Sequence, residues 1–314
     1  MSVILLAIPG WEPEAWLEHF RALANGRAVR LAPDFGDPAA IAYACVWKQP
    51  AGLLAKLPKL KAIFSLGAGV DHLLADPSLP DVPIARIVDA DLTSRMTGHV
   101  ALHALLHQRR MKLYEAQQRE RVWRDLGEAP AEEVRVGVLG MGALGAAAAE
   151  ALRRLGFRVS GFSRSPKAIA GIESFAGDAA MNAFLGRTDI LVCLLPLTAA
   201  TRGILRYDLF RRLAHDGVLG GPVLINAGRG GLQIEADILR ALDDGTLAGA
   251  SLDVFEEEPL PTTSPFWIHP KAYVTPHNAA SSDPRALARN VMNQIERFER
   301  GLPLENLVDR KRGY

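Results

Sequence analysis

The sequence predicts an α/β protein with two domains built on parallel sheets, and three observations support this prediction. Strand-like apolar segments alternate with helix-like segments along most of the chain, which is the pattern of parallel strands covered by helices. A long helix-like stretch at residues 98–123 interrupts the alternation and is a candidate bridge between domains. The length of 314 residues suits two domains of ordinary size better than one.

The first set of predicted strands occupies the N-terminal third of the chain, at residues 2–8, 27–31, 41–47, 61–66 and 83–88. The first of these segments has no basic region and no small-residue cleavage site, so we interpret it as a buried strand and not as a signal peptide. It is also too short to span a bilayer, as are the later apolar runs. We therefore expect a cytoplasmic protein with no membrane partner.

The second set of predicted strands follows the long helix, at residues 134–139, 158–162, 189–194, 223–226, 248–252 and 272–275. A C-terminal helix comes after the last strand. Asp283 is a suitable N-cap, Pro284 suits the first helical position, and Gly301 ends the helix.

Charge and cysteine content narrow the class of protein. The formal net charge is +1, which gives no electrostatic reason to expect a nucleic acid partner. Cys45 and Cys193 are the two cysteines, and each is flanked by apolar residues in a strand-like run. We expect two buried free thiols in a reducing compartment, although the sequence leaves open a disulfide between them.

A glycine-rich turn follows the strand at residues 134–139. Gly140, Gly142 and Gly145 form a G-x-G-x-x-G pattern between this strand and a helix-like run of small residues. In a dinucleotide site the first glycine allows the turn, the second lets the pyrophosphate approach, and the third lets helix and strand pack. We expect cofactor phosphates to meet Gly140, Met141, Gly142, Ala143, Leu144 and Gly145; the alternative is a turn used only for packing.

The next strand carries the choice of cofactor. NAD sites usually place an acidic residue at its carboxyl end, but this sequence has Ser163, Arg164, Ser165 and Lys167 there. These side chains suit a 2′-phosphate, because Arg164 offers a planar, bidentate contact and Lys167 offers a point charge. We expect NADPH to be the cofactor and NADH to be weaker; the alternative is a solvated basic loop.

Three further polar segments follow strands of the second set. They are residues 225–231 with Arg229, residues 252–260 with Glu256, Glu257 and Glu258, and residues 274–280 with His277. Open α/β sheets bind ligands at the carboxyl ends of their strands, so an arginine, a glutamate and a histidine should meet near the cofactor. Taken singly, each residue is more often structural: a surface or hydrogen-bonded histidine, a solvated acidic turn, or an arginine in a glycine turn.

These motifs resemble those of the D-isomer-specific 2-hydroxyacid dehydrogenases, over the whole chain. The resemblance rests on the glycine pattern and on the segments 226–230, 253–259 and 275–277. It is greatest to the glyoxylate/hydroxypyruvate reductase A subgroup, in the segments 66–71 and 163–165 and in the tail 308–314. It implies two Rossmann-like or flavodoxin-like domains with the active site in the cleft between them. Residues 1–98 and 283–314 would form the substrate-binding domain, and residues 99–282 the dinucleotide-binding domain.

The resemblance also implies how the reaction is divided among residues. Reducing a small 2-keto acid such as glyoxylate or hydroxypyruvate to a D-2-hydroxy acid needs hydride, a proton and a clamp for the carboxylate. His277 would be the general acid, Glu258, the glutamate directly before the proline, would favour its protonated form, and Arg229 would bind the carboxylate.

The resemblance implies further contacts to the substrate and to the cofactor. The substrate would meet Trp47 and the backbone of Ala68, Gly69 and Val70, besides Arg229 and His277. The alternative for Trp47 is a core or interface tryptophan. The remaining residues expected at the cofactor are Leu195, Pro196, Thr201, Ala227, Gly228, Asp253 and Ala279. A homodimer through the cofactor domain is also implied.

Two features depart from this pattern or stand outside it. Asn278 replaces the apolar residue that often follows the catalytic histidine, which would alter the hydrogen bonding around the nicotinamide. His99, His103 and His107 repeat every four residues along one helix face, as metal ligands do. Neither a carboxylate nor a cysteine is interleaved with them, so we favour an interface or a solvated face and expect no metal.

Two other functions remain open at this point. One is a non-catalytic, NAD(P)-sensing regulator with the same fold, although this chain lacks the long flexible extensions expected of it. The other is a related D-2-hydroxyacid dehydrogenase with another substrate. The basic loop at Arg164 argues against an NAD-preferring biosynthetic oxidation.

Overall fold

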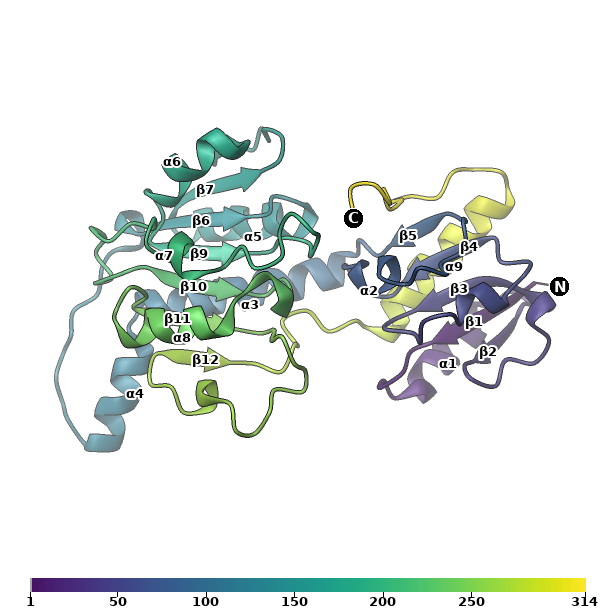
Figure 1. Cartoon of the computed structure of the whole chain (residues 1–314), viewed down its shortest axis with the longest axis horizontal. Helices are drawn as coiled ribbons and strands as arrows, with labels where there is room; N and C mark the ends of the chain where they lie inside the picture. Colours follow the sequence, from purple (N-terminus) through teal and green to yellow (C-terminus); the bar gives the residue numbers. More distant parts are fainter. Residues whose placement is uncertain (1) are drawn as a thin grey trace. The chain divides into compact units, whose positions relative to one another are not determined.

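The computed structural model describes residues 2–314, which fold into two α/β units (Figure 1). The first unit comprises the chain up to Leu92 together with Ser281–Tyr314, and the second comprises Thr93–Ala280. The boundary expected between residues 98 and 99 lies inside the helix α3 (Ala90–Gln108). The second unit begins at Thr93, in the first turn of that helix, and Gly98 does not interrupt the helix.

The first unit contains a five-stranded parallel sheet in the order β2-β1-β3-β4-β5. This is the flavodoxin-like order, and it confirms the strands expected in the N-terminal third. The strand bounds are β1 Val3–Ala7, β2 Ala28–Leu31, β3 Ile41–Val46, β4 Ala62–Ser65 and β5 Ile84–Arg86. Apart from the edge strand β2, in which only Val29 is buried, almost all of their residues are buried, because helices cover both faces of a parallel sheet.

The C-terminal helix α9 (Pro284–Glu299) packs on this first sheet beside α1 (Pro13–Leu23). Its N-cap is the expected one, since the Asp283 side chain accepts a hydrogen bond from the Ala286 amide at 2.8 Å. Leu287, Val291 and Ile295 of α9 are almost fully buried in the apolar core against the sheet. A short helix, α2 (Asp71–Leu74), follows β4.

The second unit contains a seven-stranded parallel sheet in the order β12-β11-β10-β9-β6-β7-β8. The order reverses at β6, so a topological switch point lies between β6 and β9, as in Rossmann folds. The strand bounds are β6 Arg135–Leu139, β7 Arg158–Ser163, β8 Glu173–Ala176, β9 Ile190–Cys193, β10 Val223–Asn226, β11 Gly249–Leu252 and β12 Ala272–Val274.

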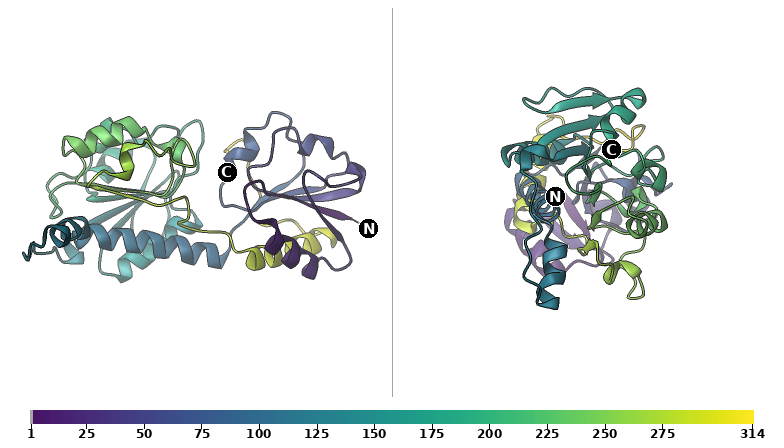
Figure 2. Two further views of the ribbon diagram at one scale, coloured as in Figure 1. Left: turned by 90° about the horizontal axis from the view of Figure 1, so that it is seen from below. Right: turned by 90° about the vertical axis from the view of Figure 1, so that its left-hand side faces the viewer.

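Helices lie on both faces of the second sheet (Figure 2). Besides α3, they are α4 Met111–Glu120, α5 Ala143–Arg154, α6 Met181–Leu185, α7 Tyr207–Phe210 and α8 Glu235–Asp243. In residues 2–314 no helix is both long and apolar enough to cross a membrane. Cys45 in β3 and Cys193 in β9 are buried free thiols, and burial raises the pKa of Cys193 to about 12.

Two expectations about secondary structure were wrong. The single helix expected at residues 98–123 is two helices, because α3 ends at Gln108 and Arg110 adopts a left-handed conformation with φ 55° before α4 begins. The guanidinium of Arg110 then donates to the Leu126 carbonyl at 3.2 Å. The edge strand β8 was not expected, because its four residues are short of apolar character and lie largely at the surface.

The three histidines of α3 pack against β11 and β12. The nitrogens His103 Nδ1 and His107 Nε2 each lie 2.8 Å from the Ser251 hydroxyl, and the ring of His99 lies 4.3 Å from that of His103. Tyr273 adds an edge-to-face contact with both His103 and His107. Burial, the largest cause, lowers the pKa of His99 and His103 to about 4 and that of His107 to about 3. The face is therefore a packed, neutral one.

These histidines predict a loss of stability in mild acid. The unfolded chain binds protons near pH 6.5, whereas the folded histidines bind them only near pH 4, so stability falls as the pH drops below 6.5. We expect each such histidine to cost about 1.4 kcal/mol per pH unit in the free energy of unfolding. Urea unfolding at pH 7 and pH 5 measures the slope. His103→Gln should flatten it and the exposed control His215→Gln should not; equal slopes would contradict the explanation.

Candidate active site

The glycine turn between β6 and α5 is shaped by close backbone contacts. Gly140 has φ +110° and its amide donates to the Phe162 carbonyl at 3.0 Å. A Cβ on Gly140 would lie 2.8 Å from the Leu194 backbone, and one on Gly145 would lie 1.9 Å from the Gly140 carbonyl. The turn thus has no room for side chains at these two positions.

The second glycine differs, because space is left beside it. A Cβ on Gly142 would meet nothing within 4 Å, and this exposed residue is the N-cap of α5 with no side chain capping it. Ala143 is exposed and Leu144 half-buried, whereas Met141 is buried against Gly161. An open helix N-terminus bordered only by a glycine fits the pyrophosphate of a dinucleotide, because its amides and dipole favour negative charge there.

The loop after β7 lies at the carboxyl end of the neighbouring strand. The Ser163 hydroxyl donates to the Ser165 carbonyl at 2.6 Å, and the Lys167 amide donates to the Ser174 hydroxyl at 3.0 Å. These bonds shape the loop while Arg164, Ser165 and Lys167 remain exposed. Two cationic side chains with no acidic residue between 161 and 167 fit a phosphorylated ribose better than a free one.

The side chain of a threonine holds the loop that follows β9 through hydrogen bonds to its backbone. The Thr201 hydroxyl donates to the Pro196 carbonyl at 2.7 Å and accepts from the Thr198 amide at 2.8 Å. Leu195 and Pro196 therefore start a fixed loop at the switch point, facing the glycine turn across the Leu194 backbone. Ala227 and Gly228 follow β10, the next strand of the sheet, and both are largely buried.

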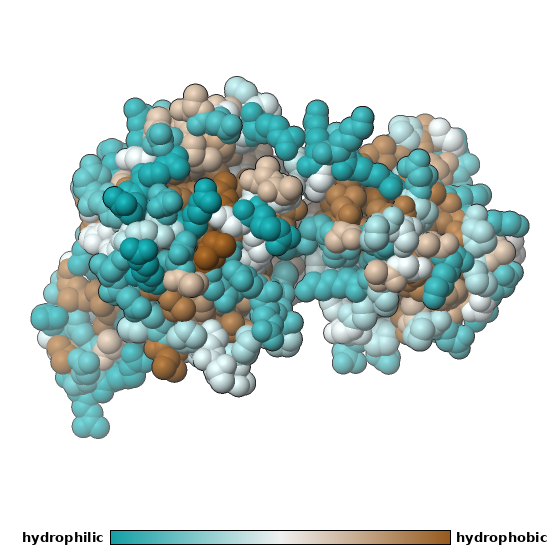
Figure 3. Space-filling view, viewed as in Figure 1, coloured by the Kyte–Doolittle hydropathy of each residue, from teal (hydrophilic) through white to brown (hydrophobic). Residues whose placement is uncertain are grey.

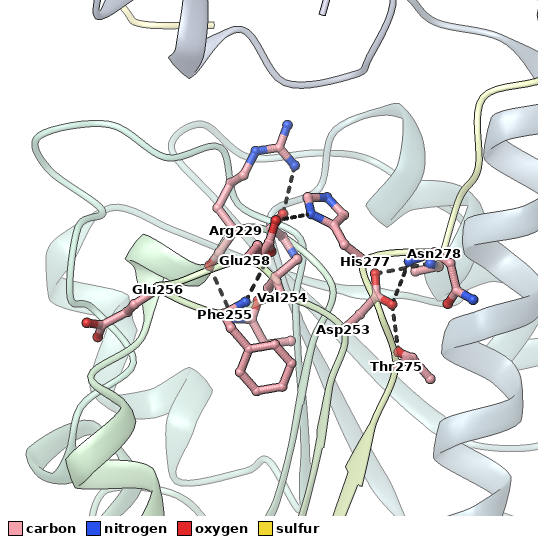
Figure 4. A network of polar contacts seen from close by, with 12 residues as sticks. Arg229, Asp253, Val254, Phe255, Glu256, Glu258, Thr275, His277 and Asn278 are labelled. Carbon is pink, nitrogen blue, oxygen red and sulfur yellow. Dashed lines mark hydrogen bonds and ion pairs between the residues drawn. The ribbon is translucent and has the colours of Figure 1, made fainter. Parts of the chain in front are cut away.

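A histidine and a glutamate meet at the ends of β11 and β12 (Figure 4). The distance from His277 Nδ1 to Glu258 Oε2 is 2.8 Å, and the two side chains remain 29% and 22% exposed. Glu258 Oε1 also accepts from the Phe255 amide at 3.2 Å, which fixes the carboxylate. The Glu256 amide instead donates to the Glu235 carboxylate at 2.7 Å, the Glu235 amide donates to the Glu256 carboxylate at 3.5 Å, and Glu257 is exposed. Of the three glutamates, Glu258 is the one at the histidine.

The backbone of His277 is held by Asp253. His277 has φ 51°, and its amide donates to the Asp253 carbonyl at 2.8 Å. The Asp253 carboxylate accepts from the Thr275 hydroxyl at 2.6 Å and from the amides of Asn278 and Ala279 at 3.0 Å each. A left-handed histidine is unusual and persists only where its neighbours are fixed. Burial raises the pKa of Asp253 despite these three bonds.

Arg229 belongs to the loop after β10. Its guanidinium donates to the Gly228 carbonyl at 2.8 Å, and the neighbouring Gly230 lies so near the loop after β11 that a Cβ would be 1.8 Å from the Phe255 carbonyl. Figure 4 shows the side chains of Arg229, Glu258 and His277 gathered on one side of the strand ends, with Glu256 directed away. The structure thus brings together a cation for a carboxylate and an acid–base pair.

The residues expected at the substrate from the first unit also lie near one another. Trp47 follows β3, stacks on Trp11 at a centroid distance of 5.7 Å and contacts the His72 ring at 4.8 Å. A Cβ on Gly67 would be 2.1 Å from the Trp47 ring, so the tryptophan rests on the glycine loop that continues into Ala68, Gly69 and Val70. The Ser65 hydroxyl lies within hydrogen-bonding distance of the carbonyls of Gly67 and Gly69, at 3.0 Å and 3.2 Å, and so holds this loop.

Two buried amides at the site were not singled out from the sequence. The sequence motif includes Asn226 without indicating a role for its side chain, and it does not include Gln233. Their side chains are hydrogen-bonded to each other at 2.8 Å. Nothing local in the sequence marks Gln233, because its other buried partner, the Val254 carbonyl, is 21 residues away.

Comparison with known proteins gives matches along the whole chain. The family described as D-isomer specific 2-hydroxyacid dehydrogenase, NAD binding domain, matches residues 101–279. A protein of Yersinia enterocolitica named glyoxylate/hydroxypyruvate reductase A is 38% identical over 99% of each chain. A protein of the same name from Salmonella newport is 41% identical over 94% of each.

Solved structures of similar proteins share the fold of the entire chain. One is an NADPH-dependent glyoxylate/hydroxypyruvate reductase from Sinorhizobium meliloti in complex with NADP and sulfate. It is 50% identical, with a TM-score of 0.96 over 100% of both chains. Another, a D-isomer specific 2-hydroxyacid dehydrogenase from Xanthobacter autotrophicus in complex with NADPH and MES, is 41% identical with a TM-score of 0.94, covering 100% of this chain and 99% of the other.

Proposed function

The chain belongs to the D-isomer-specific 2-hydroxyacid dehydrogenase family, and from this premise we propose that it reduces small 2-keto acids to D-2-hydroxy acids with NADPH. The observation that carries the proposal is the 2.8 Å contact between His277 and Glu258 beside Arg229. Glyoxylate and hydroxypyruvate are the proposed substrates, in keeping with the names of the similar reductases.

The side chains of this site divide the reaction between them. NADPH, when bound, supplies the hydride. Arg229 binds the substrate carboxylate through its planar guanidinium and orients the keto group. His277 then gives the proton on Nε2 to the carbonyl oxygen, because its Nδ1 is engaged by Glu258. Glu258 stabilises the charged imidazole before transfer, and Asp253 fixes the backbone from which the ring projects.

The preference for NADPH is proposed from the loop after β7. Arg164 and Lys167 would contact the 2′-phosphate, with Ser163 and Ser165 beside it. The glycine turn and the open N-terminus of α5 would hold the pyrophosphate, and Leu195, Pro196 and Thr201 would border it across the switch point. Ala227, Gly228, Asp253 and Ala279 would lie toward the nicotinamide end.

The preference for small substrates is proposed from the first unit. Trp47 is fixed by stacking on Trp11 and by the lack of a side chain at Gly67, so it forms a rigid wall. The amides of Ala68, Gly69 and Val70 would meet the substrate carboxylate from this wall. Glyoxylate and hydroxypyruvate are short enough to lie beneath it.

We also propose a homodimer through the second unit, located in the cytoplasm. Large apolar side chains are exposed on α3, on α4 and just beyond: Leu102 (54%), Leu113 (53%), Val122 (44%) and Trp123 (103%). Figure 3 shows hydrophobic atoms at the surface over α4. Exposed apolar patches of this kind mark interfaces, and the two buried free thiols suit a reducing compartment.

The reaction is tested by consumption of NADPH and of NADH with glyoxylate, hydroxypyruvate, pyruvate and phenylpyruvate. We expect the two small acids and NADPH to give the fastest turnover. His277→Ala should lower kcat by about 10²–10⁴-fold, because it removes the proton donor. A wild-type protein that binds NADPH but reduces none of the four acids would overturn the proposal and favour a cofactor-sensing regulator.

Arg164→Gln tests the site for the 2′-phosphate. We expect the KM for NADPH to rise at least about tenfold while the KM for NADH changes little, because the lost bidentate contact involves only the phosphate. Arg154→Gln is the matched control, since Arg154 is an exposed cation at the other end of α5. A loss that affects both cofactors equally would assign Arg164 to folding of the loop.

The dimer is tested by the mass of the protein in solution. We expect the mass of two chains for the wild type and a shift toward one chain for Trp123→Ser combined with Leu113→Ser, because both changes remove exposed apolar surface. Trp267→Ser, a half-exposed tryptophan elsewhere on the second unit, is the control. A wild-type protein with the mass of one chain would contradict the proposal.

A further inference from the structure

A chain of buried amides joins the loop that carries Arg229 to the loop that carries Glu258. Gln233 Nε2 donates to the Val254 carbonyl at 2.9 Å, and Gln233 Oε1 accepts from Asn226 Nδ2 at 2.8 Å. Asn226 Oδ1 in turn accepts from the Gly228 amide at 3.1 Å, and its Nδ2 also reaches the Arg229 carbonyl at 3.3 Å. Asn226 and Gln233 are 0% and 1% exposed.

The direction of this chain is fixed by its two ends. The Val254 carbonyl can only accept, so Gln233 must present its amino group to it and its oxygen to Asn226. The Gly228 amide can only donate, so Asn226 must turn its oxygen toward it. Each amide therefore has one orientation, and water does not compete because both are buried. Such a fully satisfied buried network fixes a single arrangement of the segments it joins.

The joined loops are in direct contact on the side of the catalytic residues. Gly230, next to Arg229, approaches the Phe255 carbonyl so closely that a Cβ would lie 1.8 Å from it. The Phe255 amide donates to Glu258 at 3.2 Å. A shift of the Val254–Phe255 backbone would therefore move the carboxylate that contacts His277, and it would change the position of Arg229 relative to that pair.

We propose that Gln233 is a positioning residue that sets the Arg229 guanidinium relative to the Glu258–His277 pair. The inference rests on the proposed function, in which Arg229 binds the substrate carboxylate. Gln233 itself is 1% exposed and so offers almost no surface to a substrate or cofactor. Its carboxamide acts through Asn226 on one side and through the Val254 carbonyl on the other.

The experiment compares Gln233→Met with the control Gln108→Met. Methionine keeps a side chain of similar length but removes the hydrogen bonds of Gln233 to Asn226, to the Val254 carbonyl and, at 3.5 Å, to the Glu235 carboxylate. Gln108 is also buried in the second unit and also donates to a backbone carbonyl, that of Ala129. We expect Gln233→Met to raise the KM for the keto acid at least about tenfold while the dissociation constant of NADPH stays within about twofold. The control should change neither value by more than about twofold.

A double-mutant cycle with Arg229→Lys separates positioning from general stability. If Gln233 acts through Arg229, the double variant loses little more kcat/KM than the worse single variant. Losses that multiply, or a Gln233→Met protein with the wild-type KM, would overturn the inference. If Gln233→Met does not fold, Gln233→Asn takes its place, because it keeps a neutral amide but is one methylene too short to reach both Asn226 and the Val254 carbonyl.

A second readout keeps the inference separate from the proposed reaction. If the wild type reduces no keto acid, the proposed function fails, and oxalate binding to the NADPH-loaded protein is measured by calorimetry for the same four proteins of the cycle. Weaker oxalate binding in each single variant, without a further loss in the double variant, would support the inference. Binding of oxalate that Gln233→Met leaves unchanged would overturn it.

Discussion

The candidate site depends on the parallel register of three neighbouring strands. Asn226 at the end of β10 pairs with Leu252 of β11, and Leu252 pairs with Val274 of β12. Because parallel strands in this register end at one level, the loops that follow them begin side by side. Arg229, Glu258 and His277 are separated by 29 and 19 residues in sequence, yet each lies within a few residues of the same sheet edge.

Around this edge, the protein uses buried polar groups to hold exposed ones. Asp253 accepts four hydrogen bonds from the segment around His277, three at its carboxylate and one at its backbone carbonyl. These bonds support a histidine with a left-handed backbone. The paired amides of Asn226 and Gln233 do the same for the arginine loop. Catalytic geometry of this kind is precise only when a second layer of residues locks the first.

Much of this arrangement could be predicted from the sequence, because its signals are local. The G-x-G-x-x-G turn, the buried strands and the N-cap Asp283 each depend on residues close together in the chain. The break at Arg110 and the strand β8 escaped prediction, because helical periodicity continues through the first and the second lacks an apolar pattern. The roles of Asp253 and Gln233 also escaped, because their partners come from other strands and become neighbours only in the sheet.

The central claim is that His277 donates the proton and that Glu258, whose Oε2 lies 2.8 Å from its Nδ1, acts through that ring. The most direct test is a double-mutant cycle in which kcat for keto acid reduction is measured for the wild type, His277→Ala, Glu258→Gln and the double variant. We predict that each single variant is slower than the wild type and that the double variant is little slower than His277→Ala alone, because the carboxylate has no catalytic role without the imidazole. Losses of kcat that multiply in the double variant would contradict the claim.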